Sequence, residues 1–197
     1  MLKRLFDILF SVLGIFVLLP VYLLIAILIK MDSSGSIIFK QKRVGKNERQ
    51  FHVYKFRTMV VDAEKMGMKI TVGRDPRITK FGHFLRKYKL DELPQIFNVL
   101  FGSMSFVGPR PEVQEYIDEY PKAVKKEVLS VKPGITDNAS IEFRNESEML
   151  FQSLDPRKTY IDEILPIKQK LYLDYVRNKT FIGDIKIIIK TIVKILR

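Results

Sequence analysis

The sequence has no cysteine and only two histidines, His52 and His83, among its 197 residues. Without cysteine, disulfides play no part in the fold, which fits a reducing compartment. So few histidines argue against a zinc site or a histidine-based catalytic triad. The phosphate-binding patterns G-x-x-x-x-G-K-[ST] and G-x-G-x-x-G are also absent, as are internal repeats and low-complexity tracts. Any chemistry must therefore rest on carboxylates and basic side chains.

Basic residues outnumber acidic ones, with 34 Lys and Arg against 22 Asp and Glu, for a formal net charge of +12. A surplus of this size predicts anionic partners, namely nucleic acid, acidic lipid head groups or phosphorylated substrates. The basic blocks lack the interleaved aromatic side chains of a stacking platform, which disfavours nucleic acid. The length suits one domain with a hydrophobic core, plus an anchor.

An uncharged apolar run at 8–29 predicts a membrane anchor within residues 1–30. As a straight helix this run would extend about 33 Å, enough to cross a hydrocarbon core of roughly 30 Å. It continues into Lys30-Met31-Asp32 without the small-residue pattern of a cleavage site, so a removable signal peptide fits poorly.

The course of this anchor depends on Pro20, which lies near the middle of the run and is expected to kink the helix. Lys3 and Arg4 precede the run and Lys30 follows it, so the distribution of positive charge favours neither orientation. The pattern alone leaves two arrangements open. One is a kinked helix that crosses the membrane, and the other is a re-entrant helix that bends at Pro20 and leaves on the same face.

Residues 31–197 predict a single α+β domain that is mainly helical. A small β-hairpin is expected from strands at 36–44 and 50–59, joined by Gly45-Lys46-Asn47-Glu48. Helices are expected at 60–68, from Asp91 onward, at 112–130 and at 158–177.

The segment 184–197 predicts a basic amphipathic helix. Lys186, Lys190 and Lys194 recur every four residues along it. The opposite side carries Ile185, Ile188, Ile189, Ile192 and Leu196. Such a helix either lies in the interface of an anionic bilayer or packs on the core with its lysines in water, and the pattern does not choose between them.

Asp91 and Glu92 stand out among the acidic residues because basic residues surround them. Alone, such a pair is an N-cap and acidic first turn of the following helix. Here Arg86 lies upstream, and Arg110 lies downstream between two prolines that stiffen its backbone. Adjacent arginines keep an aspartate ionised, which suits a nucleophile. A phosphoanhydride admits an anionic attacker when cations, or Mg²⁺ held by a carboxylate, neutralise its phosphates.

Six sequence blocks in a fixed order carry a resemblance to a known family. The blocks are Lys55-Phe56-Arg57-Thr58-Met59, Arg74-Asp75-Pro76-Arg77-Ile78-Thr79, Leu85-Arg86-Lys87, Leu90-Asp91-Glu92-Leu93-Pro94-Gln95, Phe97-Asn98-Val99 and Met104-Ser105-Phe106-Val107-Gly108-Pro109-Arg110-Pro111. Each block alone is weak, but the ordered set covers nearly the whole chain. The sequence therefore resembles the bacterial sugar transferases, small monotopic phosphoglycosyl transferases that start glycoconjugate assembly on polyprenol phosphate.

The resemblance implies an enzyme of the bacterial inner membrane whose active site faces the cytoplasm, with a re-entrant anchor broken at Pro20. It implies transfer of a sugar phosphate from a UDP-sugar to undecaprenyl phosphate, with release of UMP and a requirement for Mg²⁺. Asp91 matches the nucleophile that forms a covalent phosphosugar intermediate. Glu92 would assist through metal binding or proton handling, and either carboxylate is a candidate Mg²⁺ ligand. The implied partners include anionic phospholipid, and a homodimer is left open.

The resemblance also assigns basic residues to the substrates. The predicted substrate-binding residues are Arg86, Arg110, Lys55, Arg57, Arg77 and Arg144. Arg86 and Arg110 are expected to bind the diphosphate or the nucleotide. Lys55 and Arg57 are explained equally well by salt bridges that support the hairpin.

One segment departs from the pattern PGITG-(L/W)-AQV-NGR of many family members. The positions that agree are Pro133, Gly134, Ile135, Thr136, Ala139 and Arg144, and those that depart are Asp137, Ser140, Glu142 and Phe143. Asp137 and Glu142 either bind a hydroxyl or amine of an unusual sugar or lie on the surface, and the surface is the preferred interpretation. Leu19 also replaces the serine that often precedes the proline of the anchor. The identity of the sugar therefore does not follow by analogy.

Two other functions are weighed against this one. A membrane-tethered protein that binds polyanions without chemistry would show steep salt dependence and indifference to Asp91. An inactive scaffold is disfavoured by the intact Asp91-Glu92 pair, and an assay for UMP release separates it from an enzyme.

Overall fold

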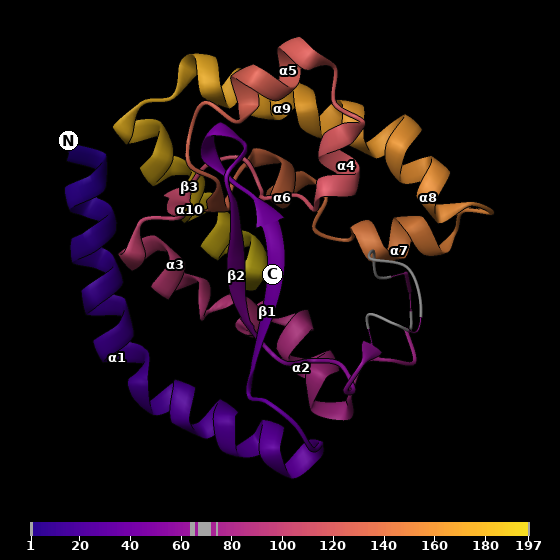
Figure 1. The fold of residues 1–197 in the computed structure, drawn as a ribbon. Coiled ribbons are helices and arrows are strands. Elements are labelled where there is room, and N and C mark those ends of the chain that lie inside the picture. Colours follow the sequence, from indigo (N-terminus) through magenta and orange to yellow (C-terminus); the bar gives the residue numbers. More distant parts are fainter. Residues whose placement is uncertain (1, 64–65, 67–71, 74, 197) are drawn as a thin grey trace.

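The computed structural model describes residues 2–63, 66, 72–73 and 75–196. Over these residues the chain is mainly helical, with two small two-stranded sheets near its centre (Figure 1). This confirms the predicted mainly helical α+β character. The helix predicted at 60–68 lies largely outside the described residues, and residues 60–63 form turns.

Helix α1, Leu2–Asp32, is the described helix that is long and apolar enough to cross a membrane. Its buried residues lie on one side of the helix, as the helical period requires, and they are Asp7, Ser11, Ile25 and Ile29. The opposite side exposes Leu2, Leu5, Leu9, Val12, Leu13, Phe16, Val17, Leu23, Leu24 and Ile27. One face of α1 thus packs on the protein along its length, and the other presents a continuous apolar surface.

Pro20 lies inside α1 without dividing it into two helices. In Figure 1 the axis of α1 nevertheless changes direction part-way along its length. The bend agrees with the kink expected from proline, whereas the predicted break of the helix is not seen. The re-entrant course remains a prediction.

The predicted hairpin is confirmed. Strands β1, Ile38–Val44, and β2, Gln50–Phe56, pair antiparallel, with Ile38 opposite Phe56 and Val44 opposite Gln50. Their turn contains the short 3-10 helix Lys46–Glu48, in which Asn47 adopts φ of 54°. Both strands are shorter than predicted, and because β2 ends at Phe56, Arg57 lies beyond the sheet.

A second, parallel pair joins β3, Ser105–Val107, to β4, Gly134–Thr136. The remaining helices are α2 Lys80–Lys87, α3 Gln95–Phe101, α4 Gln114–Asp118, α5 Lys122–Val128, α6 Asn138–Glu142, α7 Glu146–Phe151, α8 Pro156–Thr159, α9 Leu165–Asn178 and α10 Phe181–Leu196. The helix predicted at 112–130 is α4 and α5, separated at Pro121. The helix predicted at 158–177 is α8, the π-helix Tyr160–Ile164 and α9.

Two of the apolar clusters among the described residues bear on the candidate site. The larger one packs α4, α5 and α9 around the fully buried rings of Tyr160 and Tyr172. The second joins α1 to β2 and α2 through Ile25, Ile29, Phe56 and Leu85. The second cluster fixes the anchor to the hairpin, and the candidate site lies on it.

Helix α10 packs on the core, which is one of the two alternatives predicted for 184–197. Asp184 and Ile187 are buried, with α10 packed against β3 and β4. The exposed side carries Ile182, Ile189, Ile192 and Val193 together with Lys186, Lys190 and Lys194. The helix is therefore part of the core on one face, and its other face is an exposed apolar strip beside lysines, suited to a lipid interface.

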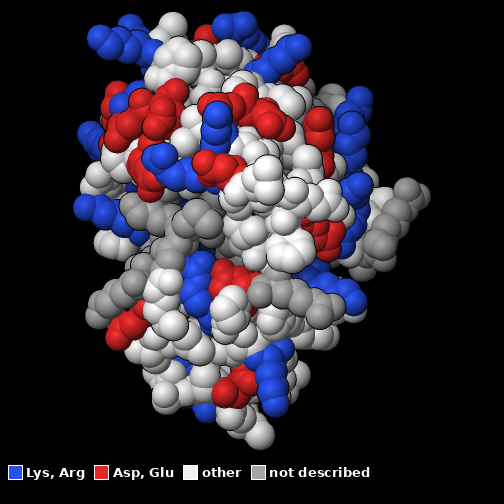
Figure 2. Space-filling model, turned by 90° about the vertical axis from the view of Figure 1, so that its right-hand side faces the viewer, with Lys and Arg blue, Asp and Glu red and all other residues white. Residues whose placement is uncertain are grey.

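Figure 2 shows the face that carries α7 and α8, where acidic and basic side chains are intermingled. Such a mixture does not form the single-sign patch that grips a nucleic acid. The arrangement of charges on this face therefore does not support the alternative in which the protein binds polyanions without chemistry.

Candidate active site

Asp91 and Glu92 lie in a 3-10 turn, Leu90–Glu92, that joins α2 to α3. The prediction that a helix begins at Asp91 is wrong by four positions. Helix α3 begins at Gln95, because Pro94 at its N-cap has no N–H and the preceding residues close tighter i to i+3 bonds. The turn places both carboxylates in the interior, with Asp91 7% and Glu92 9% exposed. Neither side chain is the simple helix cap of the alternative interpretation.

Glu92 is held by two cations. Lys55 Nζ lies 2.8 Å from Glu92 Oε1, and Arg110 donates to the same oxygen at 2.5 Å. Burial alone would raise the pKa of Glu92, but Arg110 and Lys55 hold it well below its usual range. Glu92 is therefore an ionised, fully paired carboxylate that gathers positive charge at the site.

Asp91 has the opposite environment. Its Oδ1 is buried without a hydrogen-bond partner among the described residues. Burial raises the pKa of Asp91, Lys55 opposes this rise, and the neighbouring Glu92 adds to it. The expectation that adjacent arginines keep Asp91 ionised needs correction. Arg110 pairs with Glu92 through both carboxylate oxygens, and the pKa of Asp91 is raised. Asp91 is left as a poorly solvated carboxylate with an uncommitted oxygen.

Arg86 approaches from the last turn of α2, where it is half-buried. Burial lowers the pKa of Arg86, and the negative charge of Asp91 is the largest opposing effect, followed by that of Asp75. The predicted neighbourhood of Arg86 and Asp91 is thus present in the fold. Arg77 lies in the same region, where it forms a hydrogen-bonded ion pair with Asp75.

The other two predicted substrate ligands make contacts elsewhere. Arg57 Nη2 donates to the carbonyl and hydroxyl oxygens of Ser33, at 2.7 and 2.9 Å, just after the end of α1. Arg144 Nη2 donates to the carbonyl oxygen of Ile195 in α10, at 3.3 Å. In this structure both residues contact the end of a helix or the residues just after it. The contact of Arg57 with Ser33 is structural but is not the hairpin salt bridge of the alternative, whereas Lys55 reaches the site.

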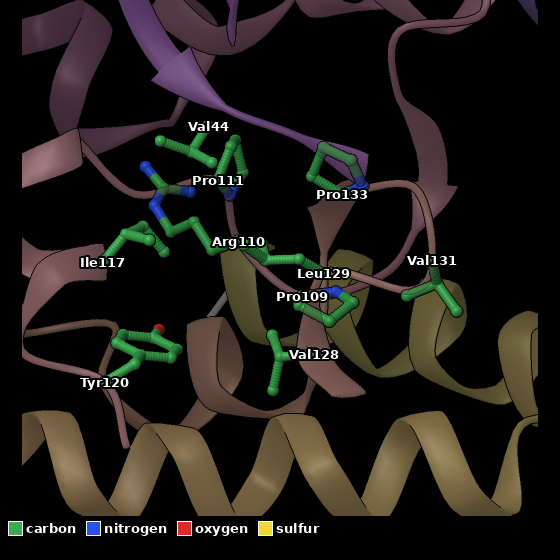
Figure 3. A pocket seen from close by; sticks show the side chains of 10 residues that line it. All are labelled: Val44, Pro109, Arg110, Pro111, Ile117, Tyr120, Val128, Leu129, Val131 and Pro133. Carbon is green, nitrogen blue, oxygen red and sulfur yellow. The ribbon is translucent and has the colours of Figure 1, made fainter. Parts of the chain in front are cut away.

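Arg110 is positioned by close backbone packing. Gly108 and Gly134 lie so near each other that a Cβ on Gly134 would come within 2.1 Å of Gly108 N, which only glycine permits. Figure 3 shows the Arg110 side chain extending from between Pro109 and Pro111 along an apolar cavity. The stem is packed against apolar groups, and the guanidinium is directed to Glu92.

A second buried charged cluster adjoins Arg110 and was missed by sequence reasoning. Glu112, 5% exposed, pairs with Arg43 at 3.5 Å and accepts from the Tyr160 hydroxyl at 3.0 Å. Lys168 is buried beside them and pairs with Glu146. Only tertiary packing joins these segments, although Glu112 follows directly after the block that contains Arg110.

Asp137 is buried, contrary to the preferred surface interpretation. It is 1% exposed and caps α6, accepting from Ser140 N at 3.0 Å and from the Ser140 hydroxyl at 2.7 Å. Burial raises the pKa of Asp137, while Ser140 and then Arg110 oppose the rise. Glu142 lies at the surface as predicted. Two of the divergent positions, Asp137 and Ser140, thus form one capping motif.

The comparison with protein families decides the identity of the chain. The family model described as bacterial sugar transferase matches residues 1–197. The chain belongs to this family. The resemblance read from the six sequence blocks is confirmed over the full length.

Named relatives of this sugar transferase come from several bacteria. A UDP-glucose:undecaprenyl-phosphate glucose-1-phosphate transferase of Xanthomonas campestris pv. campestris is 40% identical over 98% of this chain and 38% of its own length. A UDP-N-acetylgalactosamine-undecaprenyl-phosphate N-acetylgalactosaminephosphotransferase of Aeromonas hydrophila is 36% identical over 99% of this chain and 44% of its own. The exopolysaccharide production protein PSS of Rhizobium leguminosarum bv. phaseoli is 39% identical over 98% of this chain and 94% of its own length. The chain spans about two fifths of the length of the first two.

The carboxylates of this sugar transferase can be tested for their fit to Mg²⁺. Among the described residues, no cluster of three or more His, Cys, Asp or Glu side chains is arranged to hold a metal by itself. Mg²⁺ often takes one or two carboxylates and completes its shell with substrate phosphates and water. The unpartnered Oδ1 of Asp91 fits such a ligand. Glu92 would bind the ion only by releasing Lys55 or Arg110.

Proposed function

We propose that this sugar transferase moves a sugar phosphate from a UDP-sugar to undecaprenyl phosphate and releases UMP. The relatives named for this chemistry support the reaction class. The observation that carries the proposal is the unequal pair at 91 and 92, with one buried carboxylate paired to two cations and the other uncommitted. A diphosphate needs cations around it and an anionic group free to attack, and this arrangement supplies both.

In the first step, an oxygen of Asp91 attacks the phosphorus atom that carries the sugar. The bond from that phosphorus to the bridging oxygen breaks, and UMP leaves with the electron pair. The product is a mixed anhydride between Asp91 and the sugar phosphate. Because burial destabilises the Asp91 carboxylate, the anion is more basic than an exposed aspartate and is a better nucleophile.

In the second step, a phosphate oxygen of undecaprenyl phosphate attacks the same phosphorus atom. The bond to Asp91 breaks, and the carboxylate is regenerated. Lys55, Arg86 and Arg110 are the cations assigned to the phosphate oxygens in both steps. Glu92 holds Lys55 and Arg110 in place, so its role in this scheme is to position positive charge.

The requirement for Mg²⁺ belongs to the proposal. Asp91 would hold the ion through its unpartnered Oδ1 together with phosphate oxygens of the substrate, and Glu92 would join them only by releasing Lys55 or Arg110. The ion would supply further neutralisation of the diphosphate. Lys55 and Arg110 remain bound to Glu92 unless the carboxylate exchanges partners.

A re-entrant course for α1 is part of the same proposal. Both ends of α1 contact the same globular body. Lys3 donates to the carbonyl oxygen of Val107 at 3.0 Å, and Asp32 accepts from Phe81 N at 3.1 Å. A helix of this length, about 45 Å if straight, would place its ends on opposite sides of a hydrocarbon core of roughly 30 Å. Contacts at both ends favour a bend and a common, cytoplasmic side.

The test is chemical. The protein is incubated with Mg²⁺ and UDP-glucose or UDP-N-acetylgalactosamine, without lipid acceptor, and the peptide containing Asp91 is examined by mass spectrometry. We expect the mass of one sugar phosphate on that peptide and release of UMP. Asp91→Asn should abolish both, whereas the exposed Asp118→Asn should abolish neither. An Asp91→Asn protein that still turns over would refute the role of Asp91, and a salt-dependent polyanion affinity without UMP release would favour the non-catalytic alternative.

A further inference from the structure

Tyr22 connects the membrane helix to the turn that carries Asp91 and Glu92. It lies two residues after Pro20 on the protein-facing side of α1, where it is half-buried. Its hydroxyl donates to the carbonyl oxygen of Leu93 at 2.8 Å. Leu93 follows Glu92 directly, so this contact joins the anchor to the backbone of the site.

The Tyr22 ring also touches the strand that supplies Lys55. Its centroid lies 5.5 Å from that of Phe56 and 5.9 Å from that of Phe97. Phe56 is the neighbour of Lys55 in β2, and Phe97 belongs to the first turns of α3. Tyr22 therefore contacts β2, which carries Lys55, and α3, which follows the turn that carries Glu92.

The apolar cluster around Tyr22 forms the floor of the site. Its members from the body include Phe56, Leu85, Leu90 and Leu93, and those from α1 include Tyr22, Ile25 and Ile29. Each of the four body residues is adjacent in sequence to a site residue, respectively Lys55, Arg86, Asp91 and Glu92. The apolar neighbours pack with α1 in this cluster, and the charged residues lie next to them in the chain. The second half of the anchor is thus the surface on which the site is assembled.

The far end of α3 is fastened to the same helix. Arg4 donates to the carbonyl oxygens of Val99 and Leu100, at 2.6 and 2.8 Å. Arg4 and Tyr22 would be about 27 Å apart in a straight helix, whereas Leu93 and Leu100 span only about 10 Å. The long side chains and the bend of α1, which holds α3 on its inner side in Figure 1, close this gap. The anchor therefore holds α3 near both of its ends.

We propose that Tyr22 is a positioning residue that sets the height of Asp91 relative to the bilayer. In apolar surroundings a phenol hydroxyl has few alternative partners, so the bond to Leu93 resists rearrangement. The UDP-sugar is soluble and can still reach Asp91 if Asp91 is displaced. The phosphate of undecaprenyl phosphate is confined to the depth that the bilayer imposes. The inference rests on the proposed function and adds to it that the anchor aligns the nucleophile with the acceptor.

Tyr22→Phe tests the inference because it removes the hydroxyl and keeps the ring against Phe56 and Phe97. In lipid vesicles we expect transfer to undecaprenyl phosphate to fall about fivefold, the factor expected for one neutral hydrogen bond, and formation of the Asp91 adduct without acceptor to change less than about twofold. Backbone amides at 92–97, except at Pro94, which has no N–H, should exchange hydrogen about fivefold faster. The matched control, Tyr88→Phe, removes a hydroxyl from an exposed ring directly after α2 and should change none of these.

The outcomes separate a positioning role from a structural one. An equal loss in both half-reactions would indicate general damage to the fold and would overturn the inference. Unchanged exchange at 92–97, or unchanged transfer to the lipid, would also overturn it. A wild-type protein that releases no UMP would refute the proposed function instead, and the exchange experiment would still report whether Tyr22 restrains the turn.

Discussion

Arg110 donates to both oxygens of Glu92, from Nη2 to Oε1 at 2.5 Å and from Nη1 to Oε2 at 3.3 Å. Lys55 donates to Oε1 as well. This pairing gives two adjacent carboxylates different environments, because Lys55 and Arg110 both form ion pairs with Glu92. Asp91 keeps an uncommitted oxygen, which supports the proposal that it is the nucleophile.

The two-point contact of Arg110 predicts that arginine cannot be replaced by lysine. Arg110→Lys keeps the positive charge but loses the planar pair of donors that matches a carboxylate or a phosphate. We expect UMP release to fall at least about tenfold, in line with the loss of a charged hydrogen bond. Steady-state assay of UMP measures this loss. Arg157→Lys is the matched control, since Arg157 forms an exposed pair with Glu115 and such pairs contribute little.

The low pKa of Glu92 predicts a stability that depends on pH. Because the folded-state pKa lies below the unfolded value of about 4.3, the stabilisation is complete above that value and is lost as pH falls through the folded pKa. Glu92→Gln should lower the melting temperature at pH 7, since it leaves Lys55 and Arg110 without their counter-charge. The difference from wild type should shrink as pH is lowered below about 4. A difference that stays constant down to pH 3 would contradict the assignment.

For Asp91 we predict the opposite dependence of stability on pH from that of Glu92. Its pKa is raised by burial, so ionisation favours the unfolded state, and stability decreases as pH rises from about 3.9 through the folded pKa. At pH 7, Asp91→Asn should therefore be inactive yet melt at the same temperature as wild type or higher. Thermal unfolding in detergent measures this. Asp75→Asn should lower the melting temperature, because hydrogen bonds from Arg77 hold the pKa of Asp75 below its usual value.

The divergent segment predicts a structural role for Asp137. Asp137→Ala removes the cap of α6 and should cost about 1 kcal/mol of unfolding free energy. Asp137→Asn keeps an acceptor for Ser140 N and removes a buried charge, so its stability should match or exceed that of wild type. The order of preference among UDP-sugars should be the same in both variants. A changed order would restore the alternative in which Asp137 binds the sugar. Asp155→Ala, at the exposed cap of α8, measures the value of a cap without burial.

Local pattern was sufficient for the hairpin, the long apolar helix α1 and the helical segments around α4, α5, α9 and α10, because apolar period and turn residues determine them. It did not predict α2, α6 and α7. It failed where tertiary contacts decide. Lys55 and Arg57 would share a face if β2 continued, but the strand ends at Phe56 and Arg57 turns to Ser33. No local signal marks Asp137 as buried, since Arg110 and Lys168, which act on its charge, come from distant segments. The pair of Arg43 and Glu112 joins segments that only the fold brings together.

The membrane course of α1 can be measured directly, because the chain contains no cysteine and single cysteines can be placed at will. Leu2 and Met31, 61% and 77% exposed near the two ends of α1, are suitable positions. Leu154 lies in the body between α7 and α8, is fully exposed, and marks the side on which the domain resides. Each cysteine variant is tested in bacterial spheroplasts with a maleimide that does not cross membranes, before and after the inner membrane is permeabilised.

A re-entrant helix predicts that all three positions react only after permeabilisation. A helix that crosses the bilayer predicts instead that Leu2→Cys reacts in intact spheroplasts while Met31→Cys and Leu154→Cys do not. The contacts of Lys3 with Val107 and of Asp32 with Phe81 favour the first result, because the second would require one of them to break. Pro20→Ala adds a further comparison. If the bend depends on the missing hydrogen bond of proline, this variant should straighten α1 and increase labelling of Leu2→Cys in intact spheroplasts.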